Sequence, residues 1–447
     1  MSAGLHVVHL YDGHEQVYEG RGSVPVVVLN LARETAAAGH NVTVLERRWD
    51  GLDRFATHEG VAFERIDLRT GADEPWTRVP YEQVTSPVGL ARLIVDRTNF
   101  ARRAHRRLRD RSFDVLHVHL PFAAGVLLTV APGLRDRTVY TAHLGELRLD
   151  ALTDDQRGEG ASGSERDVEN GSGLETPAVL SVASPDVYLA DRAAHTTVLN
   201  EDIADGFAER GVARDSLSVL PNGVDVERFT NVSREAIERV RESYDLGDGP
   251  TLLFVGTVMP RKGVLDLIRA AGRLTDGEIG DESTGDGRAG DDGTGFDLVV
   301  AGEDELDGEY AAEVLETARN AGVADALSMP GFVPAADLPA LYAAADVFVM
   351  PSLEEGFGMT VVEALAAGTP VVGTRVGAID EIVDDGVHGA VVDPNDPAGL
   401  AAALERVLTT VANSDDVIVE SQKRAQQYSW QSVGRQCEAV YRRVADE

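Results

Sequence analysis

The stretch "DVFVMPSLEEGFGMTVVEALAAGTPVVGT", Asp346 to Thr374, decides the fold prediction for this chain. A run of β-branched and aromatic residues ends at Pro351-Ser352, and an apolar helical pattern follows it and closes at Gly368. A second β-branched run then begins. Strand, helix and strand in this order predict a βαβ unit in a parallel sheet.

The same alternation recurs in both halves of the 447 residues, which exceed one ordinary core and fit two domains of about 200 residues each. We therefore expect an α/β protein with two doubly wound domains. The seam is predicted at "VLPNGVDVERF", Val219 to Phe229, where strand residues give way to Pro-Asn-Gly turn chemistry. The runs that predict strands are "LHVVHL", "NVTVLE", "DVLHVHL", "RTVYTA", "TTVLN", "TLLFVG", "FDLVVAG", "DVFVMPS" and "TPVVGT".

Two segments predict disordered, solvated insertions without chemistry: residues 153–176 and 275–295. Both are rich in Gly, Asp, Glu and Ser and almost lack large apolar residues, so burial cannot offset the entropy lost on ordering.

The formal net charge is −34, and the acidic residues are spread along the whole chain. Only two lysines, Lys262 and Lys423, occur among 41 basic residues. Surplus carboxylate with little lysine favours a protein dissolved in molar salt, where charge repulsion is screened at about 3 Å. An ordinary acidic protein is the alternative. We expect no nucleic-acid partner.

A single cysteine, Cys437, agrees with a reducing compartment. The N-terminal "SAGLHVVHL" lacks the basic and apolar regions of a signal peptide, and the longest mostly apolar run is too short to span a membrane. We expect a cytoplasmic protein, soluble or peripheral at the inner face of the membrane.

Glu355 and Glu363 flank the Gly-Phe-Gly turn that follows the strand. Open α/β sheets bind ligands beyond the carboxyl ends of their strands, and a helix that begins there presents unpaired N–H groups to an anion. Glu363 lies about five residues into the helix, among apolar neighbours, where a carboxylate needs partners. Two carboxylates that accept hydrogen bonds from diols, with N–H groups between them for phosphate, predict a sugar-nucleotide site.

The chain resembles the retaining glycosyltransferases of family 4. The resemblance lies in the two glutamates at this spacing and in the order of the motifs around them, and it covers nearly the whole chain. The motifs are "PNGVD", "PSLEEGFGMTVVEALAAGTPVV", "GVHGAVVDPNDPAGLAAAL" and "YSWQSVGRQCEAVYRRV".

The resemblance implies the GT-B fold, an α/β architecture of two doubly wound Rossmann-like domains that face each other across a cleft. Residues 1–222 would form the N-terminal, acceptor-side domain, completed by a C-terminal helix at about 428–447. Residues 223–427 would form the domain that binds the nucleotide-sugar donor.

In the family pattern, Glu355 would hold hydroxyls of the donor hexose and Glu363 the ribose of the nucleotide. Backbone N–H groups of the turn would bind the sugar and the diphosphate. The residues expected to bind the donor in this way are Gly356, Phe357, Gly358, Met359 and Thr360. Val333 is also expected to bind the donor.

The leaving diphosphate needs its developing negative charge stabilised. The sequence has no Asp-x-Asp triplet, and we expect no metal. "VGTVMPRKG", Val255 to Gly263, places Arg261 and Lys262 after a strand, and a compact ammonium suits phosphate. The alternative is a solvated loop cation. The family usually has an arginine where this chain has Thr257, so one cation of the pattern is missing.

On the first domain, His143 ends a strand and resembles a family histidine near the donor phosphate and reacting sugar, although a purely structural role is the alternative. Gly22, in "EGRGSVPVVVLNLARE", is expected to approach the diphosphate through its N–H, and Ser23 stands where a second glycine is common. We expect His117 and His119 to line the core or the cleft and not to bind metal, because no cysteine or acidic ligand accompanies them.

Residues Arg92 to Arg111 contain eight arginines and two aspartates. Phe100, Ala104 and Leu108 form an apolar stripe at helical spacing. An ordinary exposed helix face and docking to an anionic membrane surface or phospholipid-linked acceptor are both open interpretations.

Together these features predict a retaining, metal-independent glycosyltransferase. It would move a hexose from a UDP- or GDP-linked donor to a glycan, lipid-linked or small-molecule acceptor, without another cofactor. The alternatives are a sugar-nucleotide 2-epimerase of the same architecture and a catalytically weak nucleotide-sugar binding protein, the latter suggested by Thr257.

Overall fold

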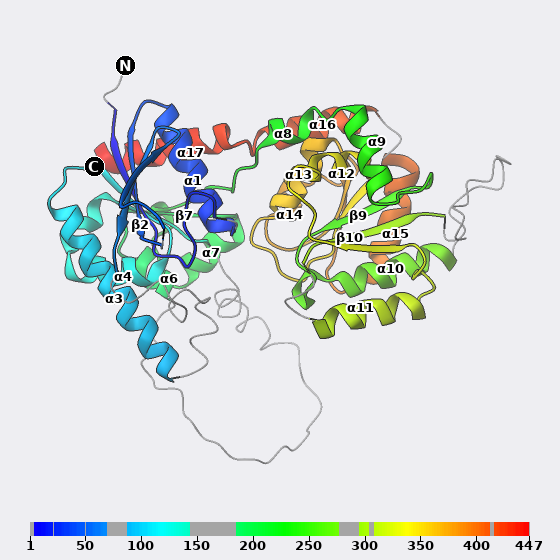
Figure 1. The fold of residues 1–447 in the computed structure, drawn as a ribbon, viewed down its shortest axis with the longest axis horizontal. Coiled ribbons are helices and arrows are strands. Elements are labelled where there is room, and N and C mark those ends of the chain that lie inside the picture. Colours follow the sequence, from blue (N-terminus) through cyan, green and yellow to red (C-terminus); the bar gives the residue numbers. More distant parts are fainter. Residues whose placement is uncertain are drawn as a thin grey trace, which may run out of the picture. The chain divides into compact units, whose positions relative to one another are not determined.

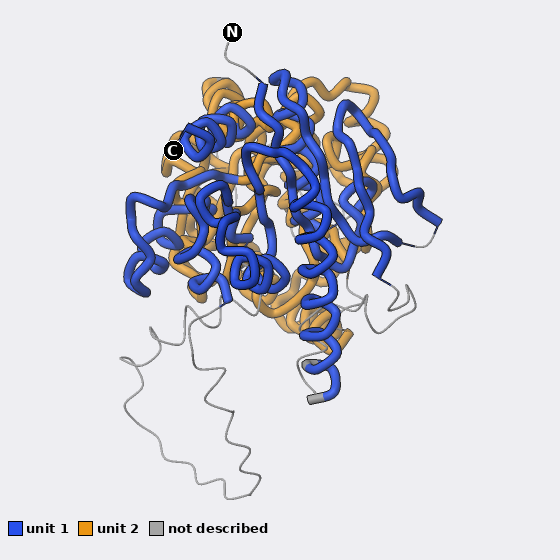
Figure 2. Tube along the Cα trace, turned by 90° about the vertical axis from the view of Figure 1, so that its left-hand side faces the viewer, with its two compact units in different colours: residues 1–221, 433–447 blue, residues 222–432 orange. Residues whose placement is uncertain are grey.

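The structure is a computed structural model that describes residues 4–20, 22–49, 51–68, 87–143, 185–276, 295–303, 308–411 and 415–446. It divides into two compact units (Figure 2). Met1–Pro221 together with Val433–Glu447 form unit 1, and Asn222–Ser432 form unit 2.

Unit 1 is built on an eight-stranded sheet in the order β3-β4-β2-β1-β5-β6-β7-β8. Every neighbouring pair is parallel except β3 and β4, which pair antiparallel at one edge. The central strands are buried on both faces, as parallel strands must be when helices cover both sides. The strands are β1 (His6–Leu10), β2 (Asn41–Arg47), β3 (Phe55–His58), β4 (Val61–Ile66), β5 (Val115–Val118), β6 (Thr138–Thr141), β7 (His195–Val198) and β8 (Leu217–Val219).

The helices of unit 1 lie on both faces of this sheet (Figure 1). They are α1 (Ser23–Ala37), α3 (Pro87–Arg109), α4 (Pro121–Val130), α6 (Pro185–Ala190), α7 (Glu201–Glu209) and, from unit 2 into unit 1, α17 (Trp430–Asp446). α17 packs closely on α1, because Gly434 stands where a Cβ would lie 2.6 Å from Cβ of Glu34. Its Tyr441 is fully buried and is hydrogen-bonded to His117 of β5 at 2.7 Å.

Unit 2 has a six-stranded parallel sheet in the order β11-β10-β9-β12-β13-β14. Its strands are β9 (Thr251–Val255), β10 (Asp297–Ala301), β11 (Leu327–Gly331), β12 (Val347–Met350), β13 (Val371–Thr374) and β14 (Gly389–Val392). The order reverses between β9 and β12, which makes this pair the topological switch point of a doubly wound sheet.

The helices of unit 2 also divide between the two faces (Figure 1). α10 contacts α11 and α15 on one side, whereas α8, α9, α12, α13 and α16 pack together on the other. Their bounds are α8 (Val226–Thr230), α9 (Arg234–Ser243), α10 (Val264–Asp276), α11 (Gly308–Asn320), α12 (Leu338–Ala344), α13 (Met359–Ala367), α14 (Ile379–Ile382), α15 (Pro397–Arg406) and α16 (Asp415–Gln426).

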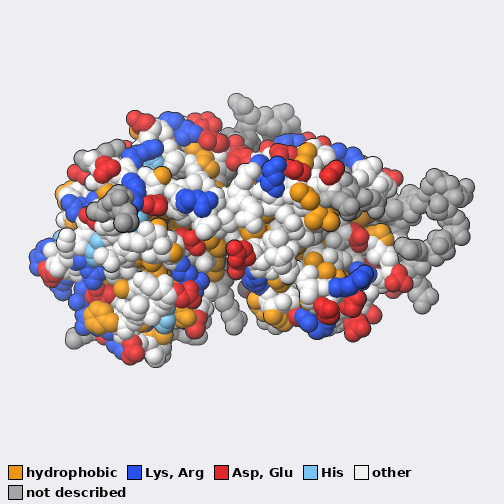
Figure 3. Space-filling view, turned by 90° about the horizontal axis from the view of Figure 1, so that it is seen from above, with side chains coloured by type: hydrophobic (Ala, Val, Ile, Leu, Met, Phe, Trp, Pro, Cys, Tyr) orange, Lys and Arg blue, Asp and Glu red, His pale blue; other side chains and the backbone are white. Residues whose placement is uncertain are grey.

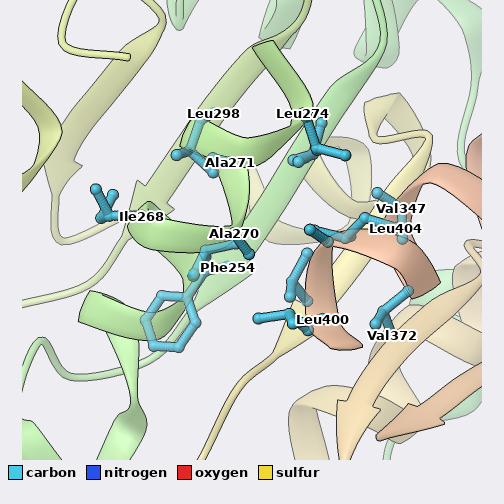
Figure 4. Packing of buried hydrophobic residues seen from close by; sticks show 14 of the residues in the cluster. Phe254, Ile268, Ala270, Ala271, Leu274, Leu298, Val347, Val372, Leu400 and Leu404 are labelled. Carbon is cyan, nitrogen blue, oxygen red and sulfur yellow. The ribbon is translucent and has the colours of Figure 1, made fainter. Parts of the chain in front are cut away.

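The core of unit 2 lies between the sheet and α10 and α15 (Figure 4). Phe254 of β9, Ile268 of α10 and Leu404 of α15 are completely buried there. Each such side chain contributes roughly 1.5–3 kcal/mol of transfer free energy. This rigid core holds the ends of β9 and β12 in place.

Most of the predicted acidic insertions lies outside the described residues. The second was predicted to begin at Thr275, but α10 continues through Asp276, so that prediction was wrong by at least two residues. On the face shown in Figure 3, acidic and basic side chains are interspersed over both units.

Within the arginine-rich segment, Phe100, Ala104 and Leu108 are buried, as the stripe predicted. Arg97 is also buried, paired with Asp12 and Asp96, and Arg107 pairs with Glu64 of β4. Part of the segment's positive charge is thus neutralised inside unit 1. No helix among the described residues combines the length and apolarity that a bilayer span requires.

Candidate active site

The candidate site of unit 2 lies beyond the carboxyl ends of β9 and β12, at the switch point of the sheet. β9 leads into a short 3-10 turn, Pro260–Lys262, and β12 leads into the loop that contains Glu355. The backbone ties these loops together, because the N–H of Leu353 donates to the carbonyl of Arg261 at 2.8 Å. Residues 92 positions apart therefore meet at one sheet edge.

Lys262 and Glu355 form an ion pair across these two loops. Their side chains are only 13% and 15% exposed, so the pair is held in a largely desolvated position. The ammonium and the carboxylate neutralise each other, and both lie at the edge where open α/β sheets in general bind ligands. The prediction had placed these residues in one site on separate grounds.

Two glycines let the backbone approach this pair closely. Gly263 has φ 65°, and a Cβ there would lie 1.9 Å from the carbonyl oxygen of Pro351. Gly377 has φ 59°, and a Cβ there would lie 2.3 Å from the carbonyl oxygen of Glu355. Only glycine fits both the space and the left-handed conformation at these positions.

The loop after β12 ends at the N-terminus of α13. Gly358 is the N-cap residue of α13, with φ 95°. Because glycine has no side chain, the N-cap residue itself accepts no hydrogen bond from the first N–H groups of the helix. The N–H of Gly356 donates to Oε1 of its neighbour Glu355 at 3.1 Å. The helix start thus offers donors and a positive dipole end to an anion.

Glu363 lies in the middle of α13, partly exposed, where its Oε2 accepts from the hydroxyl of Tyr342 on α12 at 2.9 Å. Burial raises the pKa of Glu363 to about 7, against smaller lowering effects of the Tyr342 hydrogen bond and of Arg228. Near neutral pH this carboxyl is therefore balanced between its charged and neutral forms. Such a group can accept hydrogen bonds from ligand hydroxyls when it is ionised.

The other residues predicted to bind the donor occupy different environments. Phe357 is buried against Tyr428, with ring centroids 5.6 Å apart, and Val333 is only 5% exposed. Their side chains are thus packed inside unit 2. Met359 and Thr360 form the first turn of α13 and are partly exposed. Thr257 stands partly exposed just after β9, at the position where the family pattern has an arginine.

Unit 1 contains a chain of hydrogen-bonded histidines at the carboxyl ends of β1, β5 and β6. His9 Nδ1 lies 2.9 Å from His119 Nε2, and His119 Nδ1 lies 3.0 Å from His143 Nε2. Burial lowers the pKa of His9 to about 3 and that of His119 well below its usual value, so both rings are neutral at pH 7. The chain fixes the orientation of His143, which is 7% exposed.

His9, His117 and His119 also bring ring nitrogens within 4.8 Å of one another, a spacing that can hold a metal ion. All ring nitrogens of these three histidines except Nε2 of His9 already take part in hydrogen bonds. The two nitrogens of His117 are hydrogen-bonded to the hydroxyls of Tyr441 and Thr141. These bonds favour a structural role. The prediction that His117 and His119 line the core agrees with their complete burial.

Gly22 is the N-cap residue of α1, which begins at Ser23. Its N–H donates to Oε2 of Glu15 at 2.9 Å, so the group predicted to meet a phosphate is bound to a carboxylate. Gly22, Ser23 and His143 belong to unit 1, and the roles predicted for them stay predictions.

Two contacts were not predicted from the sequence. Tyr342, in the apolar "LPALYAAAD", gave no sign that its hydroxyl meets Glu363. Glu15 gave no sign that its carboxylate accepts from the N–H of Gly22. The unusual position of Glu363 among apolar residues did require a partner, although its identity needed the fold.

Comparison with known proteins agrees with the architecture. The curated "D-inositol 3-phosphate glycosyltransferase" of Corynebacterium urealyticum is 26% identical over 426 residues, covering 94% of this chain and 90% of its own. Sucrose-phosphate synthase from Thermosynechococcus elongatus superposes with a TM-score of 0.73 at 20% identity, covering 98% and 99% of the two chains. HepE from Anabaena, solved in complex with UDP and glucose, superposes with a TM-score of 0.66 at 17% identity and covers 98% and 99%.

Two family models divide the chain between them. "Glycosyltransferase Family 4" matches residues 24–228, and "Glycosyl transferases group 1" matches residues 236–427. The two sheets of parallel strands are those of the GT-B fold. With both models matched in order, the chain belongs to the family 4 glycosyltransferases of the GT-B fold.

Proposed function

We propose that the protein is a retaining, metal-independent transferase that moves a hexose from a nucleotide-diphosphate sugar to a glycan, lipid-linked or small-molecule acceptor. The observation that carries this proposal is the Lys262–Glu355 pair at the switch point of unit 2, beside the N-terminus of α13. The cation and the row of N–H groups match the diphosphate of an activated sugar, and the carboxylate matches its hexose hydroxyls.

In the proposed reaction the bond between the anomeric carbon and the phosphate oxygen breaks, and a bond from the acceptor oxygen to the same carbon forms on the same face. The leaving phosphate takes the acceptor proton. Lys262 and Arg261 stabilise the charge that develops on the diphosphate, and Glu355 holds the hexose hydroxyls. Glu363 accepts hydrogen bonds from the ribose.

When the donor binds, its diphosphate would replace Glu355 as the partner of Lys262, and its hexose hydroxyls would replace Lys262 as the partner of Glu355. In the absence of a ligand, Lys262 is bound to Glu355. A bound donor gives the ammonium a phosphate and the carboxylate a pair of hydroxyls, so neither charge is left without a partner. The pair thus keeps both groups in place before the donor binds.

The test begins with a thermal-shift screen of UDP-, GDP- and ADP-sugars at high KCl, because a ligand at 100 times its Kd adds about 2.7 kcal/mol of stability. Transfer is then followed by NMR with the stabilising donor and an acceptor panel, with and without EDTA. An axial donor bond that stays axial in the product, unaffected by EDTA, supports the proposal. Inversion of that bond, or loss of activity with EDTA, contradicts it.

Thr257 favours a second candidate, a nucleotide-sugar binding protein with weak catalysis. Because Thr257 stands where the family pattern has an arginine, the donor diphosphate would face one cation fewer. Tight donor binding without transfer to any acceptor would support this candidate, and turnover at rates typical of transferases, about 1–1,000 per second, would exclude it.

A further inference from the structure

Unit 1 contains an open hollow of about 460 Å³ beside the connection from β1 to α1. This volume suits a small-molecule ligand. Four polar side chains of the connection and two residues after β2 line it: His14, Glu15, Gln16, Glu19, Trp49 and Leu52. The predicted function assigns none of these residues.

The connection is held rigidly against the sheet. The N–H of Val17 donates to the completely buried carboxylate of Glu46 at 2.8 Å, and Tyr18 stacks on His58 with ring centroids 3.8 Å apart. At its other end Glu15 accepts from the N–H of Gly22. The lining side chains are thus attached to a fixed backbone, which lowers the entropy cost of binding.

Glu19 adopts φ 66°, a left-handed conformation that is uncommon for a residue other than glycine. This costs on the order of 1 kcal/mol and persists only where the surrounding structure imposes it. The strained residue lies at the hollow and is exposed. Residues held in such strained conformations cluster at active sites and ligand-binding segments.

The described residues that line the hollow carry a net negative charge. Glu15 and Glu19 contribute carboxylates, and none of the lining residues that the structure describes is Lys or Arg. Burial lowers the pKa of His14, with Glu15 acting against this effect, so the imidazole is neutral at pH 7. Two buried cations lie close to the lining: the guanidinium of Arg47 is 5.9 Å from the ring centroid of Trp49, and the charge of Arg97 acts on His14. Both cations are paired with Asp96, and Arg97 also with Asp12.

Trp49 adds an aromatic ring that is partly exposed. An aromatic face suits the C–H groups of a sugar or cyclitol ring, whereas carboxylates and the amide of Gln16 suit its hydroxyl groups. A carboxylate also binds a protonated amine through a charge-assisted hydrogen bond, and it repels a phosphate.

We propose that this hollow binds the ring of a cationic, polyhydroxylated acceptor, such as an amino sugar or an aminocyclitol, and rejects phosphorylated rings. That the bound ring is the acceptor rests on the proposed function, whereas its binding in the hollow does not. It distinguishes the chain from the relative named for inositol 3-phosphate, whose name specifies an anionic ring.

The experiment measures binding of three rings that differ mainly in charge: D-glucosamine, D-glucose and D-glucose 6-phosphate. Ligand-observed NMR titrations use the full chain at fixed KCl and pH 7, without donor. We expect glucosamine to bind on the order of fivefold more tightly than glucose, and glucose 6-phosphate more weakly than glucose.

The double variant Glu15→Gln/Glu19→Gln keeps the hydrogen-bond acceptors and removes both charges. We expect the preference for glucosamine to fall to about onefold in it, while Glu209→Gln, on the exposed face of α7, leaves the preference unchanged. Circular dichroism verifies that the variants are folded.

Three results would overturn the inference. Glucose 6-phosphate could bind as tightly as glucose or more tightly, none of the three rings could bind, or the double variant could keep the preference for glucosamine over glucose. Failure of the nucleotide-sugar screen with intact glucosamine binding has another meaning. It would refute the donor function and leave the hollow as a binding site for cationic rings.

Discussion

Protonation of Glu363 should control donor binding near neutral pH. Burial raises the pKa of this carboxyl to about 7, and only its ionised form can accept two hydrogen bonds from the ribose hydroxyls of the proposed donor. If the donor binds only the ionised form, its apparent Kd is multiplied by 1 + 10^(7−pH). Binding at pH 6 is then about tenfold weaker than at pH 8.

The assay is isothermal titration with a nucleotide sugar at several pH values between 5.5 and 8.5. A nucleotide sugar is preferable to a free nucleoside diphosphate, because a terminal phosphate itself titrates near pH 6. Glu363→Gln should bind more weakly than wild type at pH 8 and show a flat profile across this range. Glu316→Gln, exposed on α11, is the matched control and should keep the wild-type profile.

Tyr342→Phe provides an independent check. The hydroxyl of Tyr342 lowers the pKa of Glu363, so its removal should move the weakening of donor binding to higher pH. A wild-type Kd that does not change with pH, or a Glu363→Gln profile with the wild-type slope, would refute the assignment of Glu363 to the donor.

The same substitution should stabilise the ligand-free protein. A carboxyl whose folded pKa is raised from 4.5 to about 7 keeps its proton in the native state over that interval, so stability falls as pH rises through it and stays lower above it. At pH 8 the loss is at most about 3 kcal/mol. Glu363→Gln avoids it and retains an acceptor for Tyr342, so its unfolding free energy at pH 8 should rise while donor binding falls.

The remaining predictions concern the ion pair, a glycine and the buried histidines. Lys262→Met should lower kcat by about 100- to 1,000-fold in a transfer assay, whereas Lys423→Met, which removes the other lysine and its surface pair with Glu420, should leave kcat unchanged. Gly263→Ala should lower the unfolding free energy by several times the ~1 kcal/mol expected for Gly322→Ala in urea denaturation, because both have positive φ but only Gly263 lies against a backbone carbonyl. When the pH is lowered from 7 to 5, the unfolding free energy should fall by about 2 kcal/mol because of His9, whose folded pKa of about 3 keeps the ring neutral while the unfolded chain binds a proton. The unfolding free energy of His9→Asn should fall less over the same pH range. Equal slopes for the variant and the wild type would contradict this reasoning.

The sequence predicted much of unit 2 because its local signals agree with one another. The strand before Pro351, the helix closed at Gly368 and the strand after it all appear where the pattern placed them. Gly368 indeed ends α13 in the left-handed conformation, with its N–H bonded back to the helix. Parallel strands with helical crossovers leave few topologies, so the alternation predicted a doubly wound sheet, whereas the position of its switch point came from the structure.

Contacts between distant segments could not be predicted in the same way. The partner of Glu363 is a tyrosine 21 positions earlier, on a helix whose rotation no local pattern fixes. The N–H of Gly22 was assigned to a phosphate, but Glu15 lies seven positions away and accepts it. In both cases the residue type was informative and the pairing depended on packing.

The ionised form of Glu363 is poorly stabilised in the ligand-free protein, although this is the form that the proposed donor site requires. An ionised carboxyl at position 363 is costly in the ligand-free protein, and a glutamine would satisfy Tyr342 at lower cost. The two acids also differ in their surroundings, because Glu355 has an ammonium beside it and Glu363 has a hydroxyl. The Tyr342 hydrogen bond and the charge of Arg228 offset only part of the desolvation of Glu363, and a ligand such as ribose would supply further hydrogen-bond donors. The energetic deficit of Glu363 in the ligand-free state is therefore the physical reason to expect its pKa to fall when the donor binds.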